Sequence, residues 1–281
     1  MMTSSNDDKT GPHTAGAHPR HRADPAASEA STRLMKGPEA DAGGPAAVNI
    51  RSLTVRKGKK EVLHGIDLKL RPGSITGLFG PSGCGKTTLM RSIVGVQKIH
   101  SGTITVLGAQ PGAKALRSEV GYVTQAAAVY RDLTLEQNVR YFARLYGAGA
   151  ERVRETIEAA GLTEQTEQKV QSMSGGQASR ASLACALVAD PKFLVLDEPT
   201  VGLDPVTREE LWGHFRGVAE RGTTILVSSH VMDEAGHCDR LVLMRHGVIL
   251  QDTDPAELLE ATGTSTYDQA FLSVITEGVA A

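Results

Sequence analysis

The spacing of apolar and polar residues changes several times along this chain. Residues 48–55 and 61–70 alternate with a period of two, which predicts two half-buried strands joined by a turn at 56–60. Residues 74–79 and 193–197 are instead nearly continuous apolar runs, as found in strands buried on both faces of a parallel sheet. The pattern therefore predicts an α/β chain that starts with an antiparallel hairpin.

Shorter runs predict the remaining strands and the helices that connect them. Further strands are expected at 103–107, 119–125 and 223–228, with a last hairpin formed by 241–244 and 247–252. Helices are expected at 88–94, 178–189, 203–220 and 231–236, and a last one opens at Asp254 with Pro255 at its first position. Strands that alternate with helices in this way are typical of a mostly parallel sheet.

The segment from about 133 to 169 has the period of amphipathic helices rather than of strands. Two apolar faces are expected, one formed by Leu135, Val139, Phe142 and Leu145 and the next by Val153, Ile157 and Leu162. This segment separates two parts of the α/β pattern. It therefore predicts a helical subdomain, over about residues 126–189, that is inserted in the core.

Residues 1–46 differ in composition from the rest of the chain. They contain five of the twelve prolines, together with glycine, serine, alanine and charges of both signs, and few apolar residues large enough to form a core. Such a segment cannot offset the conformational entropy that it would lose on folding. We therefore predict a disordered extension over 1–46 and one folded domain over 47–281.

Composition and charge narrow the classes of function. The net charge of -2 and the aromatic content of 4% give no sign of a nucleic-acid partner. Three scattered cysteines suggest a reducing compartment such as the cytoplasm. No apolar run approaches the roughly 18 residues of a membrane span, and the first residues lack the pattern of a secretory signal. Work at a membrane would therefore need a partner chain.

A glycine-rich turn lies between the predicted strand 74–79 and the predicted helix 88–94. Its glycines let successive backbone N–H groups point at one anion, and the helix N-terminus adds partial positive charge. Lys86 adds a full charge for the β- and γ-phosphates, and the Thr87 hydroxyl is a ligand for Mg²⁺. The predicted nucleotide-binding residues of this P-loop are Gly80, Pro81, Ser82, Gly83, Cys84, Gly85, Lys86, Thr87 and Thr88.

The apolar run 193–197 ends on Asp197, and Glu198 follows it. At the carboxyl end of a strand beside the P-loop, Asp197 is placed to hold Mg²⁺. Glu198 would then face the γ-phosphate and polarise a water molecule as a general base. On its own, the run fits equally well a strand that ends in two solvated carboxylates. The P-loop upstream favours the metal and base roles.

Four further motifs surround these two. Residues 174–177, Ser-Gly-Gly-Gln preceded by Met173, resemble the L-S-G-G-Q signature of ABC (ATP-binding cassette) ATPases, with methionine in place of the leucine. Gln125 resembles the Q-loop of that family, residues 201–204 its D-loop and His230 its switch histidine. Together with the P-loop and the carboxylates, these motifs follow one another in the family order.

The resemblance covers about residues 48–259 and implies the ABC ATPase fold. That fold is α/β: a RecA-like P-loop NTPase core with a mostly parallel sheet, an N-terminal antiparallel β-subdomain and an inserted α-helical subdomain. The cofactors that the resemblance implies are ATP and Mg²⁺. The resemblance also implies a head-to-tail homodimer, in which the P-loop of one copy and the signature of the other contact the same γ-phosphate.

The resemblance assigns roles to individual residues. It adds to the nucleotide-binding set Ser174, Gly175, Gly176, Gln177 and Asp204. The catalytic residues that it implies are Glu198, His230 and Gln125. The Mg²⁺ ligands that it implies are Thr87, Gln125 and Asp197.

Two stretches of sequence indicate which branch of the ABC ATPase family the chain resembles. Residues 199–205 and 228–235 are similar to those of the ATPase subunits of drug and lipid exporters, whose permeases are separate chains. The similarity implies transmembrane permease subunits as partners, no nucleic acid, and a location on the cytoplasmic face of the cell membrane. In the family, a groove beside the Q-loop receives a short helix of the permease, and residues 126–130 would line it here.

One position departs from the family pattern. The family usually places an aromatic residue before the glycine of the first hairpin, where it stacks on adenine. Here Lys57 precedes Gly58. The stack is replaced by the lysine stem, by Val55, or by nothing.

Two other functions compete with export as explanations of these motifs. Soluble ABC ATPases of DNA repair or translation usually carry two cassettes or a long coiled-coil insertion, whereas this sequence has one cassette and a short insertion. An unrelated P-loop kinase or GTPase would have no reason to contain the signature at residues 174–177. The sequence therefore favours an ATPase subunit of a membrane exporter.

Overall fold

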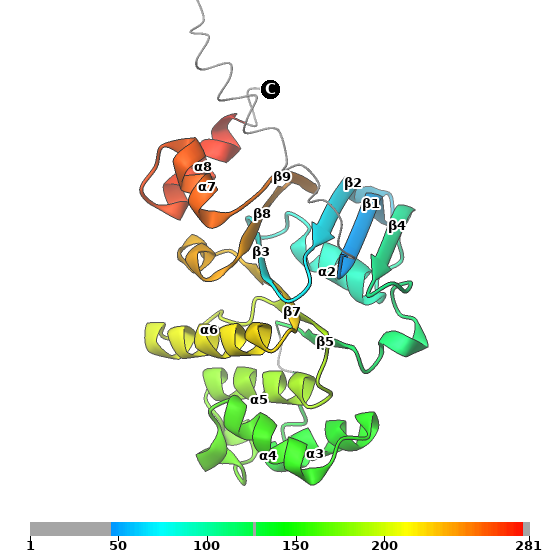
Figure 1. Cartoon of the computed structure of the whole chain (residues 1–281), viewed down its shortest axis with the longest axis vertical. Helices are drawn as coiled ribbons and strands as arrows, with labels where there is room; N and C mark the ends of the chain where they lie inside the picture. Colours follow the sequence, from blue (N-terminus) through cyan, green and yellow to red (C-terminus); the bar gives the residue numbers. More distant parts are fainter. Residues whose placement is uncertain (1–45, 126–127, 278–281) are drawn as a thin grey trace, which may run out of the picture.

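The computed structural model describes residues 46–125 and 128–277, which form two β-sheets and several groups of helices. In Figure 1 the larger sheet runs through the middle of the molecule, with the smaller sheet beside it and a group of helices at the far end. Residues 1–45 lie outside the described part of the chain, so the disordered extension stays a prediction.

The larger sheet has six strands. In spatial order they are β5 (Val120–Val123), β6 (Phe193–Asp197), β7 (Thr224–Ser229), β3 (Ile75–Phe79), β8 (Arg240–Arg245) and β9 (Val248–Thr253). The first five are parallel, and only β9 runs antiparallel to its neighbour. Strands β3, β6 and β7 are buried along their whole length, which explains their nearly continuous apolar sequences.

The smaller sheet is antiparallel and has the order β2-β1-β4. Its strands are β1 (Val48–Lys57), β2 (Lys60–Leu70) and β4 (Ser101–Val106). The hairpin of β1 and β2 was predicted from the alternating pattern, whereas the pairing of β4 with β1 was not. Helix α2 (Lys86–Val94) packs its buried side chains into the same hydrophobic cluster as this sheet. The His64 N–H donates to the Gly247 carbonyl (2.9 Å), which joins the two sheets at their edges.

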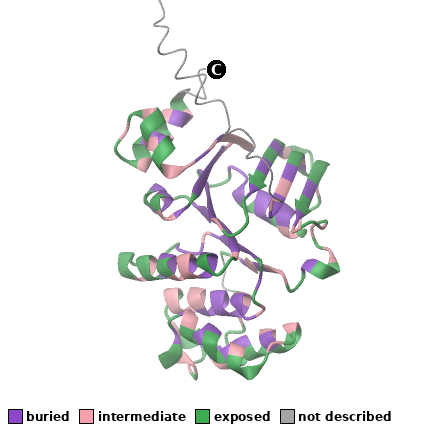
Figure 2. Ribbon diagram, in the orientation of Figure 1, coloured by how far each residue is buried: buried purple, intermediate pink, exposed green. Residues whose placement is uncertain are grey.

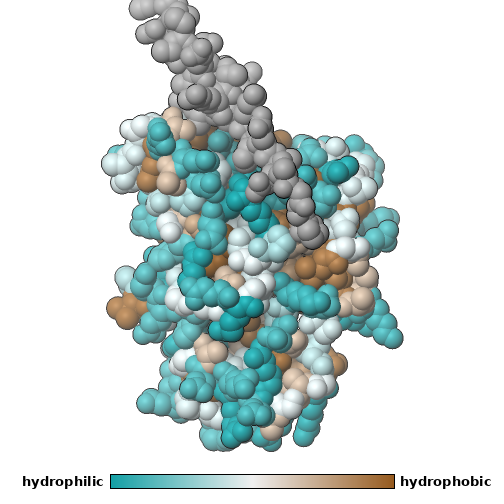
Figure 3. All heavy atoms as spheres, viewed as in Figure 1, coloured by the Kyte–Doolittle hydropathy of each residue, from teal (hydrophilic) through white to brown (hydrophobic). Residues whose placement is uncertain are grey.

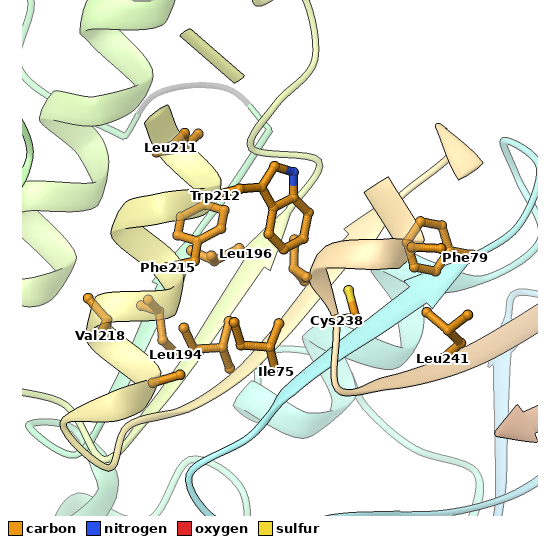
Figure 4. Packing of buried hydrophobic residues seen from close by; sticks show 14 of the residues in the cluster. Ile75, Phe79, Leu194, Leu196, Leu211, Trp212, Phe215, Val218, Cys238 and Leu241 are labelled. Atoms are coloured by element: carbon orange, nitrogen blue, oxygen red, sulfur yellow. The ribbon is translucent and has the colours of Figure 1, made fainter. Parts of the chain in front are cut away.

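Helix α6 (Pro205–Glu220) covers one face of the larger sheet. Its Trp212 and Phe215 are fully buried and meet edge to face, with ring centroids 5.4 Å apart. Figure 4 shows these rings above side chains of the sheet such as Ile75 and Leu194. The six-residue 3₁₀ helix η4 (Met232–His237) follows β7 and packs against the same cluster.

The chain ends in two helices where the sequence predicted one. The predicted helix after Asp254 is α7 (Pro255–Thr262), and a further helix, α8 (Tyr267–Glu277), follows it. Helix α7 stops at Gly263, whose φ of 61° lies in the left-handed region that terminates many helices. Ala270 and Val274 of α8 are buried against the main core, so α8 depends on tertiary packing that no short sequence pattern indicates.

The predicted helical insertion consists of three α-helices with a core of their own. They are α3 (Leu135–Tyr146), α4 (Ala150–Ala159) and α5 (Gly175–Leu187). Their buried side chains form a separate cluster, and Figure 2 shows exposed faces on α3 and α4, whereas α5 is almost entirely intermediate or buried. Leu145 was predicted on the buried face of α3 but is 65% exposed, because the buried row continues from Leu135 and Val139 to Ala143 instead. Val153, Ile157 and Leu162 are buried as predicted.

Three short 3₁₀ turns complete the described elements: η1 (Lys114–Leu116), η2 (Thr163–Gln165) and η3 (Val170–Ser172). Exposed large apolar side chains are scattered, and on the face seen in Figure 3 the hydrophobic areas are small and separate. Within the described ranges, none of the helices has the length and hydropathy that crossing a bilayer requires.

Candidate nucleotide-binding site

The predicted P-loop connects the end of β3 to the start of α2. Gly80, Gly83 and Gly85 have φ angles of 155°, 80° and 118°, which side chains rarely adopt. A Cβ on Gly80 would lie 2.2 Å from the Met244 carbonyl oxygen, so only glycine fits there. Pro81, Ser82 and Gly83 are exposed, and α2 begins without a side-chain cap. The first N–H groups of α2 are therefore free to bind an anion.

Lys86 is the first residue of α2 and is only 4% exposed. Its Nζ donates to the Gly80 carbonyl (2.6 Å) and lies 3.6 Å from Glu198 Oε1. A buried ammonium group needs such partners, because burial without them is costly. The lysine side chain thus reaches from the start of α2 back to the first residue of the P-loop, and its charge lies close to Glu198, the predicted general base.

Asp197 lies at the carboxyl end of β6, where it accepts two hydroxyl hydrogen bonds. Thr87 Oγ1 donates to its Oδ1 at 3.1 Å, and Ser228 Oγ donates to the same oxygen at 2.8 Å. Ser228 is opposite Asp197 in the parallel pairing of β6 and β7, and its Oγ also accepts from the Glu198 N–H at 3.0 Å. Ser228 was not among the predicted site residues, although it lies two positions before His230.

Glu198 lies within contact distance of the other two predicted catalytic residues, Gln125 and His230. Gln125 Nε2 donates to its Oε2 (3.2 Å), and His230 Nδ1 lies 3.5 Å from the same oxygen. The glutamate has a φ of 52°, which is uncommon for a residue with a side chain and is typical of strained functional positions. The ends of β5, β6 and β7 therefore bring Gln125, Glu198 and His230 to one point beside Lys86.

The residues present fit a magnesium ion in part. Thr87 and Asp197 supply a hydroxyl and a carboxylate oxygen already in contact, the hard oxygen ligands that Mg²⁺ prefers. Gln125, the third predicted ligand, contacts Glu198 instead. In the described part of the chain, His, Cys, Asp and Glu residues form no metal-binding group of three or more. Phosphate oxygens and water would have to complete the coordination, as is usual for Mg²⁺.

Cys84 and Thr88 belong to the predicted phosphate-binding set, but their side chains are buried. Burial raises the pKa of the Cys84 thiol above its usual range, so the thiol stays neutral. Cys84 accepts the Gly247 N–H on its carbonyl (2.9 Å), and the Thr88 carbonyl accepts from Ser92 Oγ (2.8 Å). These contacts tie the loop and helix to the core, and any contact of Cys84 and Thr88 with phosphate would come from their N–H groups.

The predicted signature begins α5. Ser174 caps this helix: its Oγ accepts from the Gln177 N–H (3.2 Å), and the Gln177 side chain accepts from the Ser174 N–H (3.0 Å). Ser174 and Gly175 are exposed. A Cβ on Gly176 would lie 3.0 Å from Leu203, so this glycine lets α5 approach the D-loop. The described contacts include no hydrogen bond from residues 174–177 to the P-loop.

Asp204 of the D-loop caps α6. Its Oδ1 accepts from the N–H groups of Val206 (3.1 Å) and Thr207 (3.0 Å), and its Oδ2 accepts from the Thr207 hydroxyl (2.6 Å). The hydrogen bond from the Thr207 side chain lowers the pKa of Asp204 most, followed by that from the Thr207 backbone. The predicted role of Asp204 in linking two nucleotide sites stays a prediction.

The position expected to hold adenine has no aromatic residue. Lys57 is exposed at the end of β1, opposite Lys60 of β2. Val55, one of the proposed substitutes, is fully buried in the core of the small sheet. It therefore offers no surface on which a base can stack, which leaves the Lys57 stem or no stack at all.

Comparison with known proteins agrees with this geometry. Residues 63–201 match the ABC transporter family. The chain is 34% identical over 244 residues to the probable multidrug ABC transporter ATP-binding protein YbhF of Escherichia coli (strain K12), a match covering 83% of this chain and 42% of YbhF. It is 36% identical over 221 residues to Nod factor export ATP-binding protein I of Rhizobium sp. (strain N33), covering 76% of this chain and 73% of that protein. The chain thus spans less than half the length of YbhF.

Solved structures show the same fold. An ATP-binding subunit of an ABC transporter superposes with a TM-score of 0.74 at 22% identity, over 82% of this chain and 99% of that one. The cbiO1 protein of Clostridium perfringens, part of the ABC transporter complex cbiONQ, gives a TM-score of 0.71 at 25% identity, over 77% and 92%. These likenesses confirm the predicted α/β fold with its antiparallel and helical subdomains. The sequence and structural matches together establish that this chain belongs to the family of ABC transporter ATP-binding proteins.

Proposed function

We propose that this chain binds and hydrolyses ATP to power an ABC-type exporter. The observation that carries the proposal is the convergence of Lys86, Asp197 and Glu198 at the N-terminus of α2, with Gln125 and His230 in contact with Glu198. Such a group combines an anion site, a site for a divalent cation and a candidate base. Relatives named for multidrug and Nod factor export support the transport of a substrate out of the cell.

Each residue of the site would have its own part in hydrolysis. The P-loop N–H groups and Lys86 would hold the β- and γ-phosphates, and Thr87 and Asp197 would hold Mg²⁺. The ion, when bound, offsets the negative charge of the phosphates. Glu198 accepts a proton from the attacking water, while Gln125 and His230 orient Glu198 and the γ-phosphate. Lys86 leaves its contact with Glu198 for the phosphate, which frees the carboxylate for the water.

The proposal includes a second copy of the chain. Ser174 and Gly175 are exposed at the start of α5, where they present a helix N-terminus and a hydroxyl to solvent. A head-to-tail homodimer would bring this end of one copy to the γ-phosphate held by the other. ATP binding would then close the dimer, and hydrolysis with release of phosphate would open it.

The proposal also includes a transmembrane permease, which would hold the chain at the cytoplasmic face of the membrane. The predicted docking groove spans residues 126–130, of which Ala126 and Ala127 lie outside the described residues. Beside them, the Ala128 N–H donates to Ser182 Oγ of α5 (3.3 Å), and Tyr130 is 48% exposed and meets Tyr141 edge to face. An exposed aromatic pair of this kind suits an apolar partner helix.

Two measurements test the proposal. The purified chain should hydrolyse ATP, and in cells it should co-purify with a membrane protein after extraction with detergent. Tyr130→Arg and Ala127→Arg should release the chain from the membrane fraction and leave basal ATP hydrolysis within a few-fold, since neither residue is among the predicted phosphate ligands. Leu272→Arg, which changes an exposed apolar residue of α8, is the matched control and should stay at the membrane. A chain that hydrolyses ATP but never associates with a membrane protein would favour the soluble alternative in DNA repair or translation.

A further inference from the structure

Two arginines of α6 form ion pairs with the segment that contains η4, and the two pairs differ in kind. Arg216 Nη1 lies 2.7 Å from Asp239 Oδ1, and its Nη2 donates to the His237 carbonyl at 2.6 Å. Arg208, two turns earlier on the same helix, has its Nε 3.5 Å from Glu234 Oε1. The Arg216 pair is 40–41% exposed on both sides. The Glu234 side chain, by contrast, is only 2% exposed.

Glu234 carries an incompletely compensated charge in the protein interior. Neither of its carboxylate oxygens, nor Arg208 Nε, has a hydrogen-bond partner among the described residues. A buried ion pair without good hydrogen bonds recovers little of the free energy lost when its charges leave water. Stability alone therefore gives no reason to place a carboxylate at this position.

The arginine of this pair also holds the D-loop. Arg208 Nη2 donates to the carbonyl of Leu203 at 3.4 Å, and the next residue, Asp204, is the N-cap of α6. Leu203 is the side chain that a Cβ on Gly176 of the signature would approach most closely. One guanidinium group thus contacts both the D-loop backbone and the buried carboxylate.

The glutamate of this pair is joined by a short path to the predicted switch histidine. The Glu234 N–H donates to the Val231 carbonyl (3.3 Å), and the Val231 N–H donates to Ser229 Oγ (3.0 Å). His230 lies between Ser229 and Val231 in the sequence, and its Nδ1 is 3.5 Å from Glu198 Oε2. Hydrogen bonds thus connect the backbone on either side of His230 to η4, which carries Glu234.

We infer that Arg208 and Glu234 are positioning residues that couple the switch histidine to the D-loop. When His230 changes its contact with Glu198, the η4 segment shifts the carboxylate, and Arg208 passes the shift to the Leu203 carbonyl and Asp204. An ion pair that is not fully hydrogen-bonded suits this task, because it can lengthen or shorten without breaking strong bonds. This inference rests on the proposed ATPase function. Neither side chain has a described contact with the P-loop, Asp197 or Glu198.

The test compares the two ion pairs in the full-length chain. Glu234→Gln keeps the shape of the side chain and removes its charge. We expect it to lower kcat for ATP hydrolysis about tenfold while KM stays within about twofold, the scale of coupling that such networks carry. Arg216→Gln, the matched control, should lower the melting temperature and leave kcat within about twofold.

A double-variant cycle separates coupling from folding. Arg208→Gln leaves Glu234 buried without a counter-charge, so this variant is expected to be unstable. Combining it with Glu234→Gln removes both charges and should restore folding, as measured by melting temperature, but not kcat. The double variant should be no slower than Glu234→Gln alone, because both substitutions interrupt one connection.

The outcomes separate this inference from the proposed function. A wild-type chain that does not hydrolyse ATP would overturn both. An active wild type whose kcat is unchanged by Glu234→Gln would overturn the inference alone. So would an Arg216→Gln variant that loses as much kcat as Glu234→Gln, since the effect would then follow from any weakening of the contact between α6 and η4.

Discussion

The two ends of the predicted nucleotide site are built differently. On the phosphate side, side chains from β5, β6, β7 and α2 contact one another, with Glu198 in reach of Lys86, Gln125 and His230. On the signature side, the described hydrogen bonds of the Ser174 and Gln177 side chains are only to each other's backbone N–H groups, and the start of α5 is exposed. One chain therefore brings the predicted phosphate-binding and catalytic residues together, and exposes the predicted signature at the start of a separate helix.

This difference indicates what each end needs in order to work. The phosphate side is preorganised by its own hydrogen bonds, so it is expected to bind nucleotide in a single chain. The signature side presents an exposed helix N-terminus that makes no hydrogen bond to the P-loop among the described contacts, which supports the proposal that its ligand is held by a second copy. The predictions below test this division, from the largest expected effect to the smallest.

Glu198→Gln should abolish most turnover and leave nucleotide binding intact. If the carboxylate accepts a proton from the attacking water, its loss should lower kcat by roughly 10²- to 10⁴-fold. It should also stabilise the closed dimer with ATP, because two negative charges no longer face the γ-phosphates. Single-turnover hydrolysis and size-exclusion chromatography with ATP measure the two effects. Glu158→Gln, an exposed carboxylate of α4, is the control, and near-normal hydrolysis by Glu198→Gln would disprove the assignment.

Ser174→Asp tests the signature side without removing the helix cap. Aspartate caps helices as well as serine does, so α5 should persist, but its charge would face the γ-phosphate of the second copy. We expect hydrolysis to fall by roughly 10²-fold with ATP binding to the single chain unchanged. Thr134→Asp makes the same change at the N-cap of α3, which has the same kind of capping box, and should have no effect on turnover.

Mixing two inactive variants sharpens this test. A chain with Lys86→Ala has a defective phosphate side, and a chain with Ser174→Asp has a defective signature side. In a mixed dimer one of the two sites combines the intact halves, so random mixing should restore about a quarter of the wild-type rate if one site suffices. Mixing two preparations of Lys86→Ala should restore nothing. The absence of recovery in the mixed dimer would contradict the head-to-tail arrangement.

Thr87 tests the cation on the phosphate side. Its hydroxyl contacts Asp197, and Thr87→Val removes this oxygen with little change in shape. The Mg²⁺ concentration for half-maximal hydrolysis should rise about tenfold, the scale of one lost ligand or supporting hydrogen bond. Thr87→Ser keeps the oxygen and should behave like the wild type. An unchanged Mg²⁺ requirement in Thr87→Val would remove Thr87 from the set of ligands.

The phosphate side was also more predictable from sequence than the rest of the molecule. Its strands have continuous apolar patterns, so Asp197 and Glu198 could be placed at a strand end beside the P-loop, and the resemblance to ABC ATPases added His230. Ser228 was missed because its role depends on register: it lies opposite Asp197 only through the pairing of β6 with β7. Sequence motifs point to the residues predicted to contact the ligand. They do not point to residues such as Ser228, which hydrogen-bond to those residues and hold them in place.

Contacts between segments distant in sequence were the least predictable. The pairing of β4 with β1, the burial of α8 and the contact of Arg208 with Glu234 all depend on tertiary packing. Leu145 shows the limit of periodicity within one helix: Ala143, a weaker apolar signal, occupies the buried row instead. Residue spacing shows which residues can share a helix face, but the neighbouring helices determine which face is buried.

The smallest expected effect concerns the adenine base of ATP, for which the described structure shows no stacking partner at the first hairpin. Val55 is buried and Lys57 is exposed, so the described structure offers no aromatic surface for adenine at the hairpin. The wild type should therefore discriminate only modestly between ATP and GTP, and Lys57→Tyr should tighten ATP binding by several-fold, since a stacked base contributes on the order of 1–3 kcal/mol in nucleic-acid binders. Lys59→Tyr, in the hairpin turn, is the matched control. Competition of ATP and of GTP against a fluorescent ATP analogue measures the affinity for each nucleotide in each variant. A wild type that strongly prefers ATP, together with a Lys57→Tyr variant of unchanged affinity, would show that a different group already holds the base.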